Sequence, residues 1–170
     1  SSKSDSRDSY LKEVIISLIQ NEFVKDEHQN IVFIEYGPGK RLNLLIELEK
    51  YFPNCNFYAI DPLYSNNLIN QIKASNTNSN IKYVEDIKEI KIEKALKKIF
   101  IARNSLEFTN PSQLREIIKS YFAEDCLMIS EINTPNIVNS GSVYLFTEYL
   151  SFYNKKSLSE IFKQEGLYLD

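Results

Sequence analysis

The stretch IVFIEYGPG, residues 31–39, decides the fold of this chain. Its first part, residues 31–34, is a continuous apolar run rich in β-branched side chains, which indicates a strand buried on both faces in the middle of a parallel sheet. The run ends at Gly37-Pro38-Gly39, and helical spacing of apolar residues follows over 42–52. In an open α/β sheet the turn after the first strand is the usual floor of a ligand site, and glycines there let a ligand approach the backbone.

The same alternation of apolar runs and helical spacing continues along the chain. Further strands are predicted over 57–60, 81–84, 99–102 and 126–129. Further helices are predicted over 10–24, 66–75, 111–122 and 157–165, with a weaker helix within 86–98. Strands that alternate with helices imply right-handed crossovers between parallel strands. The sequence therefore predicts a Rossmann-like α/β fold, a doubly wound and mostly parallel sheet with helices on both faces.

Length and composition indicate one domain. The chain has 170 residues, of which 43% are hydrophobic, and after a Ser-rich, loose tail over 1–8 we expect a single domain over 9–170. The formal charge of -3 provides no basic field for nucleic acid or anionic lipid, so we expect neither as a partner. No apolar run approaches the roughly 20 residues that a membrane span needs. Cys55 and Cys126 lie in or beside apolar segments and far apart in sequence, as buried thiols of a reducing compartment do, so we expect a cytoplasmic protein with no disulfide and no metal site.

Acidic residues follow the first three predicted strands. Asp61 lies roughly 20 residues beyond the glycines, where a ribose-binding carboxylate belongs in a nucleoside-binding unit. Glu85 and Asp86 follow the third strand, so successive strands bring acids to one edge of the sheet. Each acid could instead cap a helix or a turn, and the glycines could form a tight connection that binds no ligand. Taken together, the acids favour a ligand site.

These residues resemble the cofactor motifs of the class I S-adenosylmethionine-dependent methyltransferases. EYGPG (35–39) resembles the first motif, acid-x-Gly-x-Gly-x-Gly, although Arg41 replaces the third glycine, a change that also argues against an NAD fingerprint. AIDP (59–62) resembles the second motif, whose acid holds the ribose hydroxyls, and Asp86 with Ile87 resembles the third, at the adenine. The resemblance implies S-adenosylmethionine as the cofactor, bound by Glu35, Gly37, Gly39, Asp61, Asp86, Ile87 and Arg103. It also implies a strand order with the first strand between the fourth and the second, and the third outside the second.

Later segments resemble the sugar C-methyltransferases within that superfamily. ARNSLEF (102–108) with Asn110-Pro111 is similar to their R-x-x-L-E-H … P stretch, and SEIN (130–133) to the end of their fifth strand. FTEYLSFY (146–153), with Ser157-Leu158 and Gly166, is similar to their E-H-x-x-Y-F … S-L … G block, so the resemblance spans residues 31–169. It implies methyl transfer to a small-molecule or carbohydrate acceptor, with Asn104, Glu107 and Glu131 on the substrate side.

Two positions depart from that family. Phe108 and Tyr149 stand where it has histidines, and the one histidine, His28, lies in a polar loop as a solvated turn residue. A general base would then be Glu107, Glu131, Glu148 or Tyr149, or a group donated by a segment outside this sequence. Glu148 is our first candidate and Tyr149 our second. The aromatic cluster over 144–153 could equally pack a lid segment against the sheet.

Two other functions remain open. The missing histidines favour a catalytically impaired binding or scaffold domain of a larger glycan-assembly protein. A nucleotide-sugar or NAD-binding Rossmann enzyme is the second alternative, disfavoured by the absent third glycine. The chain ends at LYLD (167–170), where a sixth strand of the family fold would begin. We therefore expect the last strands of that fold to be missing and the protein to continue into further sequence, including other domains.

Overall fold

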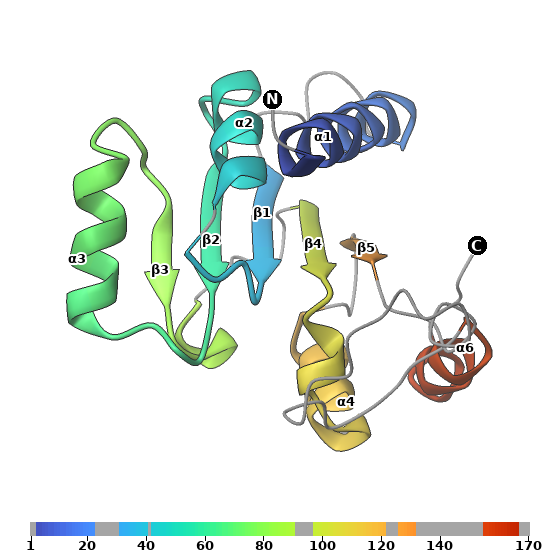
Figure 1. The fold of residues 1–170 in the computed structure, drawn as a ribbon. Coiled ribbons are helices and arrows are strands. Elements are labelled where there is room, and N and C mark those ends of the chain that lie inside the picture. The colour runs from blue at the N-terminus through green and yellow to red at the C-terminus, as the bar shows by residue number, and fades with distance from the viewer. Residues whose placement is uncertain are drawn as a thin grey trace.

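The computed structural model describes residues 3–22, 31–40, 42–90, 97–121, 126–131 and 155–166. Its strands are β1 (Ile31–Tyr36), β2 (Asn56–Ile60), β3 (Lys82–Val84), β4 (Lys97–Arg103) and β5 (Cys126–Glu131). All neighbouring strands pair in parallel, in the order β3-β2-β1-β4-β5 (Figure 1). Both the predicted Rossmann-like fold class and the predicted strand order are confirmed.

Helices cover both faces of this sheet (Figure 1). They are α1 (Lys3–Glu22), α2 (Asn43–Tyr51), α3 (Asn66–Ser75), α4 (Pro111–Tyr121) and α6 (Lys155–Gln164), with short 3-10 helices η2 (Ile87–Glu89) and η3 (Leu106–Phe108). Local signals set several of the ends. The Ser65 side chain caps α3 by accepting from Leu68 N at 3.3 Å, and Gly166 follows α6 with a φ of 79°.

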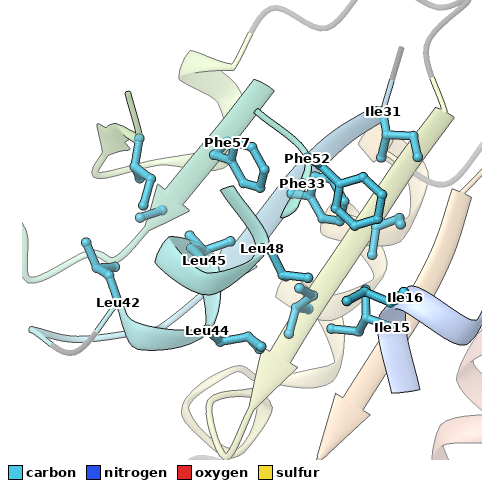
Figure 2. Close-up of a cluster of buried hydrophobic side chains, with 14 of the residues drawn as sticks. Ile15, Ile16, Ile31, Phe33, Leu42, Leu44, Leu45, Leu48, Phe52 and Phe57 are labelled. Atoms are coloured by element: carbon cyan, nitrogen blue, oxygen red, sulfur yellow. The ribbon is translucent and has the colours of Figure 1, made fainter. Parts of the chain in front are cut away.

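One face of the sheet packs against α1, α2 and α3 through odd-numbered strand residues (Figure 2). Phe33 lies at its centre, stacked on Phe57 with ring centroids 4.8 Å apart and 5.3 Å from Phe52. The other face packs even-numbered strand residues against α4 and α6. Its fully or nearly fully buried members include Val32, Ile34, Ile60, Phe100 and Ala102. Because a parallel strand with both faces covered must be apolar throughout, the uninterrupted run at the start of β1 is explained.

Two predicted elements differ from the structure. The amino-terminal helix begins at Lys3 rather than at residue 10, so residues 3–8 are its first residues and not a loose tail. In the described part of the segment 86–98, where a weak helix was expected, the helical residues are those of the 3-10 turn η2, because Ile90 is already extended at φ -81° and ψ 113°. Residues 91–96 lie outside the described part of the chain.

Cys55 and Cys126 are each partly buried, and neither is in a disulfide. Burial raises the pKa of Cys55, and it raises the pKa of Cys126 to about 12. In the described part of the chain, no helix has the length and apolar character needed to cross a membrane.

Candidate functional site

The turn after β1 contains two glycines, Gly37 and Gly39, that both have a left-handed backbone conformation but differ in their surroundings. Gly37 has a φ of 68° and donates from its N–H to Ile60 O at 2.7 Å. A Cβ added to Gly37 would lie 2.5 Å from Ser105 Cβ, so only glycine fits there. Gly39 has a φ of 64°, but a Cβ added there would meet nothing within 4 Å. Gly37 is therefore needed for packing, whereas Gly39 leaves open space above the backbone.

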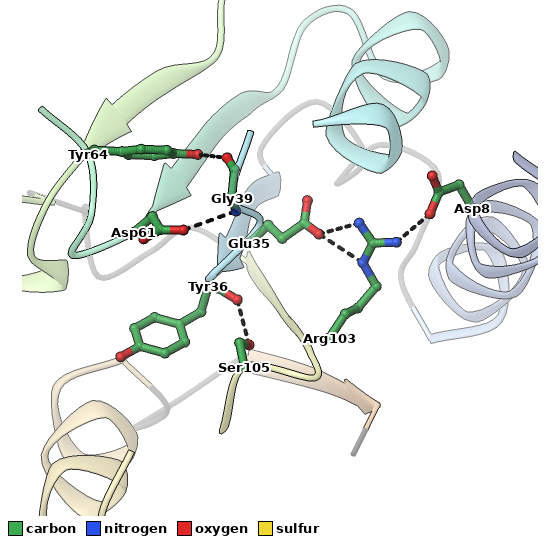
Figure 3. Close-up of polar contacts among 8 residues, drawn as sticks. All are labelled: Asp8, Glu35, Tyr36, Gly39, Asp61, Tyr64, Arg103 and Ser105. Atoms are coloured by element: carbon green, nitrogen blue, oxygen red, sulfur yellow. Dashed lines mark hydrogen bonds and ion pairs between the residues drawn. The ribbon is translucent and has the colours of Figure 1, made fainter. Parts of the chain in front are cut away.

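Asp61 at the end of β2 holds this turn in place (Figure 3). Its Oδ2 accepts from Gly39 N at 3.0 Å and its Oδ1 accepts from Leu63 N at 2.9 Å. The Tyr64 hydroxyl donates to Gly39 O at 2.9 Å, and both Asp61 and Tyr64 are buried. The turn-forming role considered for Asp61 is thus present, and it puts the carboxylate directly beside the glycine that faces open space.

Glu35 and Arg103 form a buried ion pair at the same edge (Figure 3). Arg103 donates to Glu35 Oε1 from Nε at 2.9 Å and from Nη2 at 2.7 Å, and its Nη1 bonds Asp8 of α1. Burial raises the pKa of Glu35 even though the Arg103 guanidinium opposes that rise. Glu35 Oε2 is buried and accepts no hydrogen bond from any residue that the structure describes. Arg103 therefore orients Glu35 and ties α1 to the sheet, while one carboxylate oxygen stays available.

Asp86, with Ile87, lies on the edge of a hollow of about 300 Å³ at the carboxyl ends of β1, β2 and β3. The Asp86 carboxylate caps η2 and accepts from Lys88 N at 2.8 Å. Apolar side chains from β1, β2, η2 and α4 form one part of the wall, namely Tyr36, Ile60, Ile87 and Ile117. The polar part includes the charged side chains Glu85, Lys88 and Glu116, of which Lys88 and Glu116 lie 3.8 Å apart. A hollow of this size is at the lower end of the range of about 300–1,000 Å³ typical of small-molecule sites.

The residues expected on the substrate side lie after β4 and at the end of β5. Asn104 has a φ of 49°, rare for a residue other than glycine, and its N–H donates to Glu131 O at 2.7 Å. Glu107 in η3 is fully buried, whereas Phe108 beside it is 45% exposed. Arg103 and Glu131 are register partners of β4 and β5, which brings the predicted substrate and cofactor residues to one edge.

Some predicted residues lie outside the described part of the chain, and some contacts at the site were not predicted. Glu148 and Tyr149 lie outside the described residues, as do Asn133 and the block over 146–153. Sequence reasoning missed Asp8, Tyr64 and Ser105, whose Oγ donates to Tyr36 O at 2.7 Å. The nearest signal for Tyr64 was an aromatic residue in the short connection between Asp61 and the helix predicted from residue 66. Within the described ranges, no group of three or more His, Cys, Asp or Glu side chains could hold a metal ion.

Comparisons with known proteins identify relatives in structure but not in sequence. No protein-family model matches the chain, and no curated protein matches it. LepI in complex with SAM superposes on 91% of the chain with a TM-score of 0.63 and 14% identity. The plantazolicin methyltransferase BpumL, in complex with SAH and a triazolic desmethylPZN analogue, also covers 91%, with a TM-score of 0.57 and 15% identity. The Pnkp1/Rnl/Hen1 RNA repair complex covers 96%, with a TM-score of 0.57 and 14% identity.

The chain spans 41% of the LepI chain, 68% of BpumL and 34% of the matched chain in the RNA repair complex. Because the sequence identities to these proteins are only 14–15%, the structural similarity shows a shared fold and nothing further. The matches do not single out a sugar C-methyltransferase, and the RNA repair complex means that the fold gives no ground for excluding nucleic acid as a partner. The chain therefore shares its fold with LepI, with the methyltransferase BpumL and with one chain of the RNA repair complex.

Proposed function

We propose that the chain binds S-adenosylmethionine at the carboxyl edge of its sheet and transfers the methyl group to a small-molecule or carbohydrate acceptor. The observation that carries this proposal is Gly39, whose positive φ and empty Cβ direction leave room for a ligand beside the Asp61 carboxylate. The structural likeness to proteins crystallised with SAM or SAH supports it. The resemblance to sugar C-methyltransferases supports the choice of acceptor, and two cysteines outside any disulfide fit a cytoplasmic location.

The residues at this edge suit the three parts of the cofactor. Each Asp61 oxygen accepts one backbone N–H, and since a carboxylate has about four lone-pair sites, capacity is left for ribose hydroxyls. The unpartnered Glu35 Oε2 suits the ammonium of the methionine part. The hollow beside Asp86 and Ile87 suits the adenine. The bound cofactor would supply an activated methyl group, and the protein would contribute mainly the positioning of the acceptor.

Calorimetry with S-adenosylhomocysteine on two glycine variants tests this site. Gly39→Val puts a branched side chain into the space left for the ligand, so we expect binding to be lost. Gly166→Val is the matched control, because Gly166 also has a positive φ, of 79°, and an empty Cβ direction, but follows α6. Equal affinity in the Gly39 variant and the wild type would show that the turn is only structural.

The catalytic assignment rests on Glu148 and Tyr149. If Glu148 is the general base, Glu148→Gln should lower turnover of a confirmed acceptor by about 10²- to 10⁴-fold and leave S-adenosylhomocysteine affinity nearly unchanged. Tyr149→Phe tests the hydroxyl separately. Turnover equal to the wild type in both variants would remove both residues from the mechanism.

A binding or scaffold domain of a larger glycan-assembly protein is the second candidate function. It is favoured by Phe108, which is 45% exposed at a position where the resembling family has a histidine. Tight binding of S-adenosylhomocysteine together with no methyl transfer to any acceptor would support it.

A further inference from the structure

Hydrogen bonds in the first turn of α4 hold the side-chain amide of Gln113 in a single orientation. Asn110 N donates to Gln113 Oε1 at 2.9 Å, and Gln113 N donates to Asn110 Oδ1 at 2.9 Å. This reciprocal pair is a capping box. Because a backbone N–H can only donate, the Gln113 atom that it meets must be the amide oxygen. The amide nitrogen, Nε2, is therefore the end of Gln113 that remains for other contacts.

Gln113 and Asp86 both line this hollow, Gln113 from the first turn of α4 and Asp86 from the segment after β3. Among the described residues, none accepts a hydrogen bond from Gln113 Nε2. The Asp86 carboxylate, which also lines the hollow, is an acceptor that already holds Lys88 N. Besides the charged side chains Glu85, Lys88 and Glu116, the hollow thus combines apolar walls with a neutral donor from α4 and an acceptor from the segment after β3.

This combination matches one edge of adenine. Apolar and aromatic walls suit a flat base, and adenine carries an amino donor flanked by ring nitrogens, N1 and N7, that only accept. We propose, on the basis of the proposed cofactor function, that Gln113 Nε2 donates to one of these two ring nitrogens while Asp86 accepts from the amino group. Gln113 is then the residue of α4 that selects adenine.

Binding measurements that combine substitutions of Gln113 with replacement of single ring nitrogens of the ligand test this assignment. The probes are S-adenosylhomocysteine and its 1-deaza and 7-deaza analogues, in which carbon replaces N1 or N7. The wild type should bind one analogue about fivefold to tenfold more weakly than S-adenosylhomocysteine, because its amide donor then faces carbon. Gln113→Glu keeps an acceptor for Asn110 N and so keeps the capping box, but it replaces the donor by an acceptor. This variant should bind that analogue at least as tightly as S-adenosylhomocysteine.

Two further variants separate the amide donor from the helix cap. Gln113→Met removes the donor without adding charge and should also abolish the discrimination. Asn110→Ala breaks the other half of the capping box but leaves the Asn110 N–H to hold Gln113 Oε1, so it should keep the wild-type discrimination. Thermal unfolding of each variant reports whether it is folded.

Several results would overturn the assignment. They are equal affinity of the wild type for all three probes, unchanged discrimination in both Gln113 variants, and loss of discrimination in Asn110→Ala. Each of these leaves the cofactor proposal standing, because S-adenosylhomocysteine still binds. Failure of the wild type to bind S-adenosylhomocysteine at all would instead overturn the proposed function and this assignment with it.

Discussion

At the scale of single residues, Gly37 and Gly39 share a left-handed backbone but differ in what surrounds them. Gly39→Ala should lower the free energy of unfolding by about 1–2 kcal/mol, the strain of a left-handed conformation on a residue with a Cβ. Gly37→Ala carries the same strain and also places its Cβ 2.5 Å from Ser105 Cβ. Overpacking of this kind costs about 1–3 kcal/mol more. Urea denaturation of both variants measures the difference, and equal losses would show that Ser105 moves away freely.

Glu35 should give the protein an unusual dependence of stability on pH. Burial raises its pKa above the ordinary 4.5, so in the pH range between 4.5 and the raised value the folded state binds more protons than the unfolded state. By linkage, this group's contribution to the free energy of unfolding falls as pH rises through that range. The difference in stability between the wild type and Glu35→Gln should therefore shift in favour of the wild type as pH is lowered from 7 towards 4.5.

Urea denaturation of both proteins at several pH values provides this measurement. Comparison with Glu35→Gln cancels the other titrating groups, such as Glu47, whose pKa is lowered mainly by its hydrogen bond with Lys50. A difference that stays constant with pH, or that shifts the other way, would contradict the raised pKa.

The sequence identified the acids of the site but not their partners. Asp61 and Asp86 could be predicted because each directly follows a recognisable strand, and parallel strands end at one edge. The contact of Arg103 with Asp8 could not, since it joins the first helix to the fourth strand and depends on how α1 packs. The same holds for Tyr64, whose hydroxyl reaches Gly39 only after β2 has paired with β1.

At the scale of elements, the ion pair between Asp8 and Arg103 fastens α1 to the edge of the sheet. Asp8→Asn removes one of the two carboxylates that pair with Arg103, while the pair with Glu35 remains. We therefore expect a loss of about 1–3 kcal/mol in the free energy of unfolding. Hydrogen exchange should become faster across α1. Glu13→Gln on the same helix is the control, because Glu13 is 68% exposed and, among the described residues, forms an ion pair only with Lys12, at 3.5 Å. Equal exchange in the two variants would show that apolar packing alone holds α1.

Elements with a strong apolar pattern could be predicted, and those set by short-range polar contacts could not. All five strands and the helices α2, α3, α4 and α6 lie where the apolar spacing placed them. The start of α1 was missed because residues 3–8 have no apolar periodicity, although Asp8 is buried against the sheet. The segment after β3 reads as a weak helix, yet Asp86 and Glu89 cap only one 3-10 turn.

At the scale of the whole molecule, a ligand that binds only the folded state must raise its thermal stability. S-adenosylhomocysteine at 100 times its Kd should add about 2.7 kcal/mol to the free energy of unfolding. For a chain of this length each kcal/mol shifts Tm by about 2–4 °C, so a rise of about 5–11 °C is expected. NAD should cause no comparable shift, because Arg41 replaces the glycine that a dinucleotide fingerprint requires after the turn. Gly39→Val should lose the response to S-adenosylhomocysteine. A larger shift with NAD than with S-adenosylhomocysteine would assign this edge of the sheet to a dinucleotide instead.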